Sequence, residues 1–228
     1  MSSLPEGSYV GVYRILRRLG AGGMGVVYEA EQPTIERRVA IKVLHPQYSQ
    51  DPELMRRFLN EARAVNRISH PGVVQISEHG QLPDGSSYLV MEYLRGQSLR
   101  ERLATAPLTV AQVLQIGHML ADTLAAAHRC GILHRDLKPD NVMLVADSGA
   151  RGGERTKLLD FGIAKLVAPE GDSLKTRTHT LMGTPTYMSP EQCKGAGGVG
   201  DRSDVYSLGV MLYEMLAGAP PFVAAGMG

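Results

Sequence analysis

The segment from Asp204 to Leu216 constrains the fold of this chain more than any other. Its order of residues predicts a helix that is apolar on nearly every side and ends at Gly218, with Pro220 just beyond. A helix of this kind must be enclosed by other elements, because no face of it is suited to water. The sequence therefore predicts a helical layer built around this segment.

Composition places the chain among soluble globular proteins. It has 228 residues, 43% of them hydrophobic, which is enough for the core of one domain or two lobes. Its 24 basic and 23 acidic residues leave a net charge of +1. A balanced charge gives no electrostatic footprint for nucleic acid or for an anionic membrane.

The two cysteines, Cys130 and Cys193, are too few for a disulfide framework, and the first residues do not read as a signal peptide. No apolar run approaches the roughly 20 residues that span a bilayer; the nearest candidate, Val205 to Leu216, carries Glu214. We therefore expect a cytoplasmic protein with no nucleic-acid partner and no membrane segment in this chain.

Two short polar runs contain side chains suited to catalysis. The first, His134 to Asn141, reads His-Arg-Asp-Leu-Lys-Pro-Asp-Asn, and the second is Asp160-Phe161-Gly162. Such groups suit phosphoryl transfer, in which the protein positions reactants and neutralises charge. An aspartate can orient a hydroxyl and take its proton, and aspartate with asparagine offers oxygen ligands to magnesium. For either run alone, a polar loop whose aspartates cap turns would be the default interpretation.

In this order, the two runs resemble the motifs of the protein kinase superfamily. The resemblance implies Asp136 as the catalytic base, Asn141 and Asp160 as ligands of Mg²⁺ (or Mn²⁺), and Lys138 on the transferring phosphate. Lysine two places after the base resembles the serine/threonine branch, in its bacterial type. The implied fold is α+β and two-lobed, with an antiparallel β-sheet lobe that carries one helix and a mainly helical C-terminal lobe.

The glycine-rich run from Gly20 to Gly25 separates two predicted strands, Tyr13 to Leu19 and Val26 to Glu31. The dinucleotide-binding fingerprint shares this pattern but opens a helix, whereas the valines after Gly25 favour a strand. An ordinary hairpin is the alternative interpretation. The kinase resemblance implies instead that the glycines let backbone N–H groups approach the phosphates of ATP.

The apolar strand from Val39 to Leu44 contains Lys42, and a lysine in a buried strand needs an anionic partner. The next predicted helix is capped by Asp51 and carries an apolar stripe as far as Ile68. Glu61 lies beside that stripe. The resemblance pairs it with Lys42, which then holds the α- and β-phosphates; a surface glutamate is the alternative.

A further strand, Tyr88 to Leu94, carries a gatekeeper and an adenine-binding hinge by the same resemblance. The residues that the resemblance assigns to the nucleotide site are Leu19, Gly20, Gly22, Gly25, Val27, Ala40, Lys42, Met91, Glu92 and Leu94.

Two capping boxes predict helices after Ser98 and after Thr109. The second helix is long, its apolar stripe is interpreted as core, and Gly131 is placed to end it. The Gly-rich polar stretch at 146–156 is expected to be a solvent-exposed insertion, where related kinases have a tight hairpin.

Residues 163–182 have the position and character of an activation loop, and the candidate phosphorylation sites in it are Thr176, Thr178 and Thr180. A phosphothreonine there would pair with Arg135, which precedes the base.

Three further residues are assigned supporting roles by the resemblance. Thr184 would contact Asp136 and Lys138, and Asp204 would hold the backbone of the catalytic loop. Glu191 would pair with an arginine that this chain does not supply, which predicts an unpaired carboxylate in a buried site.

The expected organisation is a flexible lead-in at 1–12, an N-terminal lobe with the hinge at 13–94, and a C-terminal lobe at 95–228 that lacks its last helices. The predicted activity is ATP- and magnesium-dependent phosphorylation of protein serine or threonine, including the chain's own activation loop through a transient homodimer. The alternative is a non-catalytic nucleotide-binding remnant or scaffold.

Overall fold

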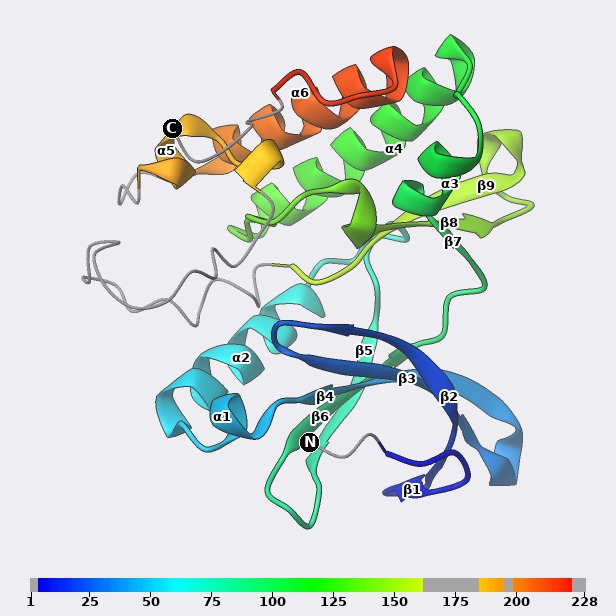
Figure 1. Ribbon diagram of the computed structural model, residues 1–228, viewed down its shortest axis with the longest axis vertical. Coiled ribbons are helices and arrows are strands. Elements are labelled where there is room, and N and C mark those ends of the chain that lie inside the picture. The colour runs from blue at the N-terminus through cyan, green and yellow to red at the C-terminus, as the bar shows by residue number, and fades with distance from the viewer. Residues whose placement is uncertain (1–3, 162–184, 195–198, 223–228) are drawn as a thin grey trace. The chain divides into compact units, whose positions relative to one another are not determined.

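The computed structural model describes residues 4–161, 185–194 and 199–222, apart from the side chains of Arg57, Glu61 and Arg151. The chain divides into two compact units, 1–66 with 74–94 and 67–73 with 95–228 (Figure 1). Residues 67–73, which we expected in the N-terminal lobe, therefore group with the second unit.

The first unit is built on a six-stranded antiparallel sheet in the order β1-β2-β3-β4-β6-β5. Its strands are β1 Tyr9–Val10, β2 Tyr13–Gly22, β3 Gly25–Gln32, β4 Arg37–Leu44, β5 Ile76–Gln81 and β6 Ser87–Glu92. β2 and β3 pair as far as Gly22 and Gly25, so the glycine-rich run lies mostly within the strands and its turn is short. One layer of the core is made by Ile15, Tyr28 and Ile41, all nearly inaccessible.

Two helices follow β4 in this unit, α1 Pro46–Ser49 and α2 Pro52–Val65. The carboxylate of Asp51 accepts hydrogen bonds from the backbone N–H groups of Glu53 (2.8 Å) and Leu54 (3.1 Å), which confirms the predicted cap. The apolar stripe of α2 buries Phe58, as the periodicity predicts, although the helix ends three residues before Ile68.

The second unit combines helices with a small antiparallel sheet in the order β7-β8-β9. Its elements are α3 Leu99–Thr105, α4 Val110–Arg129, α5 Pro190–Cys193, α6 Asp201–Ala217, β7 Gly96–Ser98, β8 Val142–Ala146 and β9 Glu154–Leu158. α4 and α6 lie side by side, and a Cβ added at Gly117 of α4 would come within 2.7 Å of Leu212 on α6 (Figure 1). Glycine at this position therefore allows the two helices to approach closely.

The helix ends of the second unit follow the sequence signals. Ser98 and Thr109 each form a complete capping box, which confirms the predicted starts of α3 and α4. Gly131 and Gly218 adopt positive φ values of 72° and 80° just after α4 and α6, a conformation that favours glycine.

The stretch at 146–156 corrects one expectation. Only its centre is a loop, because Ala146 pairs with Glu154 across a β8–β9 hairpin, and Thr156 is fully buried. The ion pair between Arg155 and Asp147 closes the loop. Polar composition suggested an exposed insertion, but the backbone pairing of β9 and the inward-facing Thr156 make it part of the sheet.

α6 begins at Asp201, three residues earlier than expected, and is not enclosed on every side by the described residues. Met211 and Met215 are buried, whereas Val205, Tyr213 and Leu216 are more than half exposed. Within the described ranges, no helix combines the length and the apolar character needed to span a membrane.

Candidate functional site

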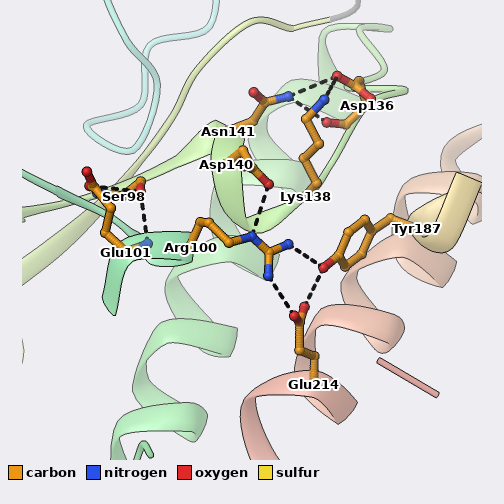
Figure 2. A network of polar contacts seen from close by, with 9 residues as sticks. All are labelled: Ser98, Arg100, Glu101, Asp136, Lys138, Asp140, Asn141, Tyr187 and Glu214. Atoms are coloured by element: carbon orange, nitrogen blue, oxygen red, sulfur yellow. Dashed lines mark hydrogen bonds and ion pairs between the residues drawn. The ribbon is translucent and has the colours of Figure 1, made fainter. Parts of the chain in front are cut away.

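The catalytic-loop residues predicted from the sequence lie together in the second unit. The Asp136 carboxylate accepts hydrogen bonds from Lys138 Nζ (2.8 Å) and Asn141 Nδ2 (3.0 Å), and Asn141 Nδ2 also donates to the Asp136 backbone carbonyl (2.8 Å). Figure 2 shows the three side chains converging. The Asp136 side chain is 17% exposed, so the carboxylate remains accessible to a substrate while its orientation is fixed.

The backbone of this loop is held from α6. Asp204, 1% exposed, accepts hydrogen bonds from the backbone N–H groups of His134 and Arg135, each at 2.8 Å. The imidazole Nε2 of His128 lies 2.8 Å from the same carboxylate. Arg135 adopts a φ of 62°, a left-handed conformation that side chains disfavour. These contacts hold the residue before Asp136 in a conformation it would not adopt alone.

His134 forms the buried floor of the loop. Its Nε2 lies 3.0 Å from the Leu159 carbonyl oxygen, and its ring packs against Phe161 with centroids 4.8 Å apart. Burial lowers the pKa of His134 despite the nearby carboxylates, so the imidazole is neutral and donates from Nε2 to the carbonyl.

Asn141 and Asp160, the two predicted metal ligands, are linked through the backbone, because the Leu159 N–H donates to the Asn141 carbonyl at 2.9 Å. The Asn141 amide nitrogen points at Asp136, so its Oδ1 is presented to other partners. Asp160 has a φ of 50°, a left-handed backbone conformation that a residue with a Cβ rarely adopts. A carboxamide oxygen and a carboxylate are suitable ligands for a hard divalent cation, so the chemistry of these residues fits such an ion.

A second polar cluster, which the sequence analysis missed, centres on Arg100 of α3 (Figure 2). Its guanidinium donates to Glu214 (2.8 Å), to the Tyr187 hydroxyl (2.5 Å) and to Asp140 (3.3 Å). The Tyr187 hydroxyl also donates to Glu214 at 2.6 Å. Burial and the hydrogen bond to Glu214 raise the pKa of Tyr187 to about 12. The cluster therefore connects α3 and α6 with the catalytic loop, to which Asp140 belongs.

The surroundings of Glu191 differ from those expected from the sequence. It is half-buried and accepts a hydrogen bond from Ser203 Oγ at 2.6 Å, and this bond lowers the pKa of its carboxyl. The expected buried, unpaired carboxylate is therefore wrong, because a serine at the start of α6 supplies a donor. Ser189 and Gln192 form a capping box at α5.

Five of the predicted nucleotide-binding residues of the first unit, Gly20, Val27, Ala40, Lys42 and Met91, share one face of its sheet. Val27 on β3 lies opposite Lys42 on β4, and Ala40 lies opposite Met91 on β6. Residues directly opposite in an antiparallel pair point to the same side, as do residues two apart on a strand. Gly20 lies opposite Val27 and adds the glycine-rich strand to this face.

Not every predicted site residue is described by the structure. The Lys42 side chain is buried, but the Glu61 side chain lies outside the described residues, so their pairing stays a prediction. The same applies to Gly162, Thr184 and the three threonines proposed as phosphorylation sites.

Comparison with known proteins identifies the family. The model of the protein kinase domain matches residues 13–227. The chain is 46% identical over 212 residues to the serine/threonine-protein kinase pkn2 of Myxococcus xanthus, covering 93% of this chain and 25% of that protein. It is 40% identical to the serine/threonine-protein kinase PrkC of Bacillus subtilis, covering 93% of this chain and 31% of that protein.

Solved structures agree. The crystal structure of the Mycobacterium tuberculosis PknI kinase domain superimposes with a TM-score of 0.75 at 32% identity, covering 99% of this chain and 80% of that one. The two-lobed α+β kinase fold is therefore confirmed. The chain belongs to the protein kinase family, and the two curated relatives pkn2 and PrkC are named as bacterial serine/threonine-protein kinases. It spans only a quarter to a third of the length of pkn2 and PrkC.

Proposed function

We propose that this chain transfers the γ-phosphate of ATP to serine and threonine hydroxyls of protein substrates. The observation that carries the proposal is the arrangement of Lys138 and Asn141 around the Asp136 carboxylate. Among the described residues, no contact favours the alternative function, a non-catalytic nucleotide-binding remnant or scaffold.

Each polar side chain of the loop has a role in this reaction. Asp136 accepts the proton of the attacking hydroxyl, and its two hydrogen bonds keep the carboxylate aimed at that hydroxyl. Lys138 carries a positive charge next to the base, where it can also meet the transferring phosphate. The divalent ion neutralises charge on the phosphates, and Asn141 with Asp160 would hold it. We assign Mg²⁺ to this position, with Mn²⁺ as a substitute.

The nucleotide would bind through the face of the first unit that carries Val27, Ala40, Lys42 and Met91. The aliphatic members suit the adenine ring, while Lys42 suits the phosphates. We assign adenine contacts to the hinge from Glu92 to Leu94 and phosphate contacts to the backbone of Gly20 and Gly22.

Radiolabel transfer from ATP to a model protein substrate tests the proposal. Asp136→Asn should lower kcat by about 10²–10⁴ while leaving the Kd for ATP nearly unchanged, because it removes the base and keeps the shape of the side chain. Lys42→Met should also abolish transfer, by misplacing the phosphates. Asp147→Asn, in the β8–β9 loop, is a matched control that should retain full activity. Transfer that survived both site substitutions would overturn the assignment.

Regulation is proposed to involve phosphorylation in trans at Thr176, Thr178 or Thr180, within a transient homodimer. A phosphothreonine adds roughly 1.5–2 negative charges, which Arg135 could pair with. Mass spectrometry of active protein should find at least one of the three threonines modified. We place the reaction in the cytoplasm, where ATP is abundant and the two exposed, unpaired cysteines would stay reduced.

A further inference from the structure

Gln192 makes two side-chain contacts with different partners. Its carbonyl oxygen accepts the backbone N–H of Ser189 at 3.0 Å, which completes the capping box of α5. Its amide nitrogen donates to the backbone carbonyl of Arg135 at 2.9 Å, although the two residues are 57 positions apart. The capping role needs only an acceptor, so the donated hydrogen bond calls for a separate explanation.

The acceptor of that hydrogen bond is a strained residue. Arg135 has a φ of 62°, and a residue with a Cβ persists in this conformation only where surrounding contacts hold it. Asp204 holds its N–H at 2.8 Å, and Gln192 holds its carbonyl. The two contacts therefore fix Arg135 from both sides, one from α6 and one from α5.

The carbonyl held by Gln192 belongs to the peptide group that leads into Asp136. A rotation of that peptide group would turn the Asp136 side chain away from Lys138 and Asn141, which bond it at 2.8 and 3.0 Å. General-base catalysis requires this kind of fixed geometry, because small displacements of the base cost rate.

We propose that Gln192 is a positioning residue for phosphoryl transfer, acting on Asp136 through the Arg135 carbonyl. The inference rests on the proposed kinase activity. It gives α5 a role beyond its own packing, because a shift of this short helix would be transmitted to the base. Ser189, by contrast, contributes its hydroxyl to the cap of α5, where it accepts the backbone N–H of Gln192, and within the described part of the chain no hydrogen bond joins that hydroxyl to the loop.

Gln192→Glu separates the two roles of this side chain. A glutamate at the same position of a capping box still accepts the Ser189 N–H, but an ionised carboxylate cannot donate to the Arg135 carbonyl. We expect kcat to fall about tenfold, the scale of losing one positioning hydrogen bond, while the Kd for ATP stays close to that of the unmodified chain. The melting temperature should fall by a few degrees, because the Arg135 carbonyl loses its donor.

Ser189→Ala is the matched control. It removes the hydroxyl of the cap and leaves both side-chain contacts of Gln192 available, so it should lower the melting temperature and leave kcat within about twofold of the unmodified chain. Gln192→Met, which can neither donate nor cap, should combine the two losses.

Equal kcat for Gln192→Glu and the unmodified chain would overturn the inference, and so would an equal loss of kcat in Ser189→Ala. Circular dichroism spectra and melting curves of each variant establish that the comparison is made between folded proteins. Failure of the unmodified chain to transfer phosphate would contradict the proposed function itself. That outcome differs from failure of this inference, in which the unmodified chain and Gln192→Glu are equally active.

Discussion

His134 is a fully buried histidine whose pKa is lowered by desolvation, so the fold contains it in the neutral form. An unfolded chain would protonate it below the ordinary pKa of about 6.5. Because the unfolded state then binds the extra proton, the free energy of unfolding falls as pH drops. The contribution of neutral His134 to the free energy of unfolding is fully present above about pH 6.5. Below that pH, protonation of this residue in the unfolded chain lowers the free energy of unfolding by up to about 1.4 kcal/mol per pH unit.

His134→Phe provides the comparison, since it keeps an aromatic contact with Phe161 and cannot be protonated. Urea unfolding at pH 5.5 and 7.5 should show a smaller loss of stability on acidification for this variant than for the unmodified chain. The other titrating groups are common to both proteins, so an identical pH dependence would mean that His134 is not neutral in the fold.

Local signals predict single residues best. Asp51, Ser98 and Thr109 were identified as helix caps, because a cap depends on partners only two or three positions away. The cluster around Arg100 was not predicted, since Tyr187 and Glu214 lie 87 and 114 positions away and no local pattern links them. Glu191 was placed in a buried site by analogy, whereas its actual donor, Ser203, comes from the start of α6.

At the scale of elements, the glycines of the β2–β3 hairpin are not equivalent. A Cβ at Gly25 would lie 2.1 Å from the Val43 carbonyl oxygen, whereas a Cβ at Gly20 or Gly22 meets nothing within 4 Å. Gly25 is therefore required by the packing of β3 on β4. Gly25→Ala should lower the free energy of unfolding by about 1–3 kcal/mol or more, measured by urea denaturation.

Gly20→Ala and Gly22→Ala make the contrasting prediction. Neither substitution crowds the protein, so the melting temperature should change little, while the Kd for ATP should rise if the backbone there approaches the phosphates. Isothermal titration with ATP measures the effect. Unchanged affinity in both variants would favour the ordinary-hairpin interpretation of this segment.

Element types were predicted more reliably than their boundaries. The helical spacing of apolar residues predicted α2, α4 and α6. However, α6 starts three residues earlier than predicted, because the polar residues Asp201 to Ser203 form its first turn. The β9 strand was taken for a loop, since its polar composition hides a buried Thr156. Asp136, Lys138 and Asn141 belong to one contiguous motif, so the resemblance could assign each of them a role, whereas the Gln192 contact with Arg135 depends on the tertiary fold.

At the scale of the whole molecule, ATP with Mg²⁺ should stabilise the folded chain. A ligand that binds only the folded state adds about 2.7 kcal/mol at a hundred times its dissociation constant. The melting temperature should therefore rise with Mg-ATP concentration in the unmodified chain and in Asp136→Asn, but much less in Lys42→Met. Differential scanning fluorimetry measures this, and an equal rise in all three would contradict the role given to Lys42.

The outer side of α6 supports the last prediction. Val205, Tyr213 and Leu216 are 54%, 51% and 59% exposed, and on the neighbouring α4 Val110 and Leu114 are 63% and 67% exposed. Each large apolar side chain left in water forgoes about 1.5–3 kcal/mol of burial, so contact between two such surfaces is favourable. We expect the 228-residue chain to bind dyes that detect exposed apolar surface and to self-associate through α6.

Two neighbouring substitutions distinguish this surface from the core. Leu216→Lys should reduce self-association in sedimentation velocity and lower dye binding without reducing the melting temperature, because the side chain is already exposed. Met215→Lys, at a position only 3% exposed, should instead destabilise the fold, because it buries an unpaired charge. A compact monomer that binds no dye before any substitution would mean that the apolar residues of α6 do not form an association surface.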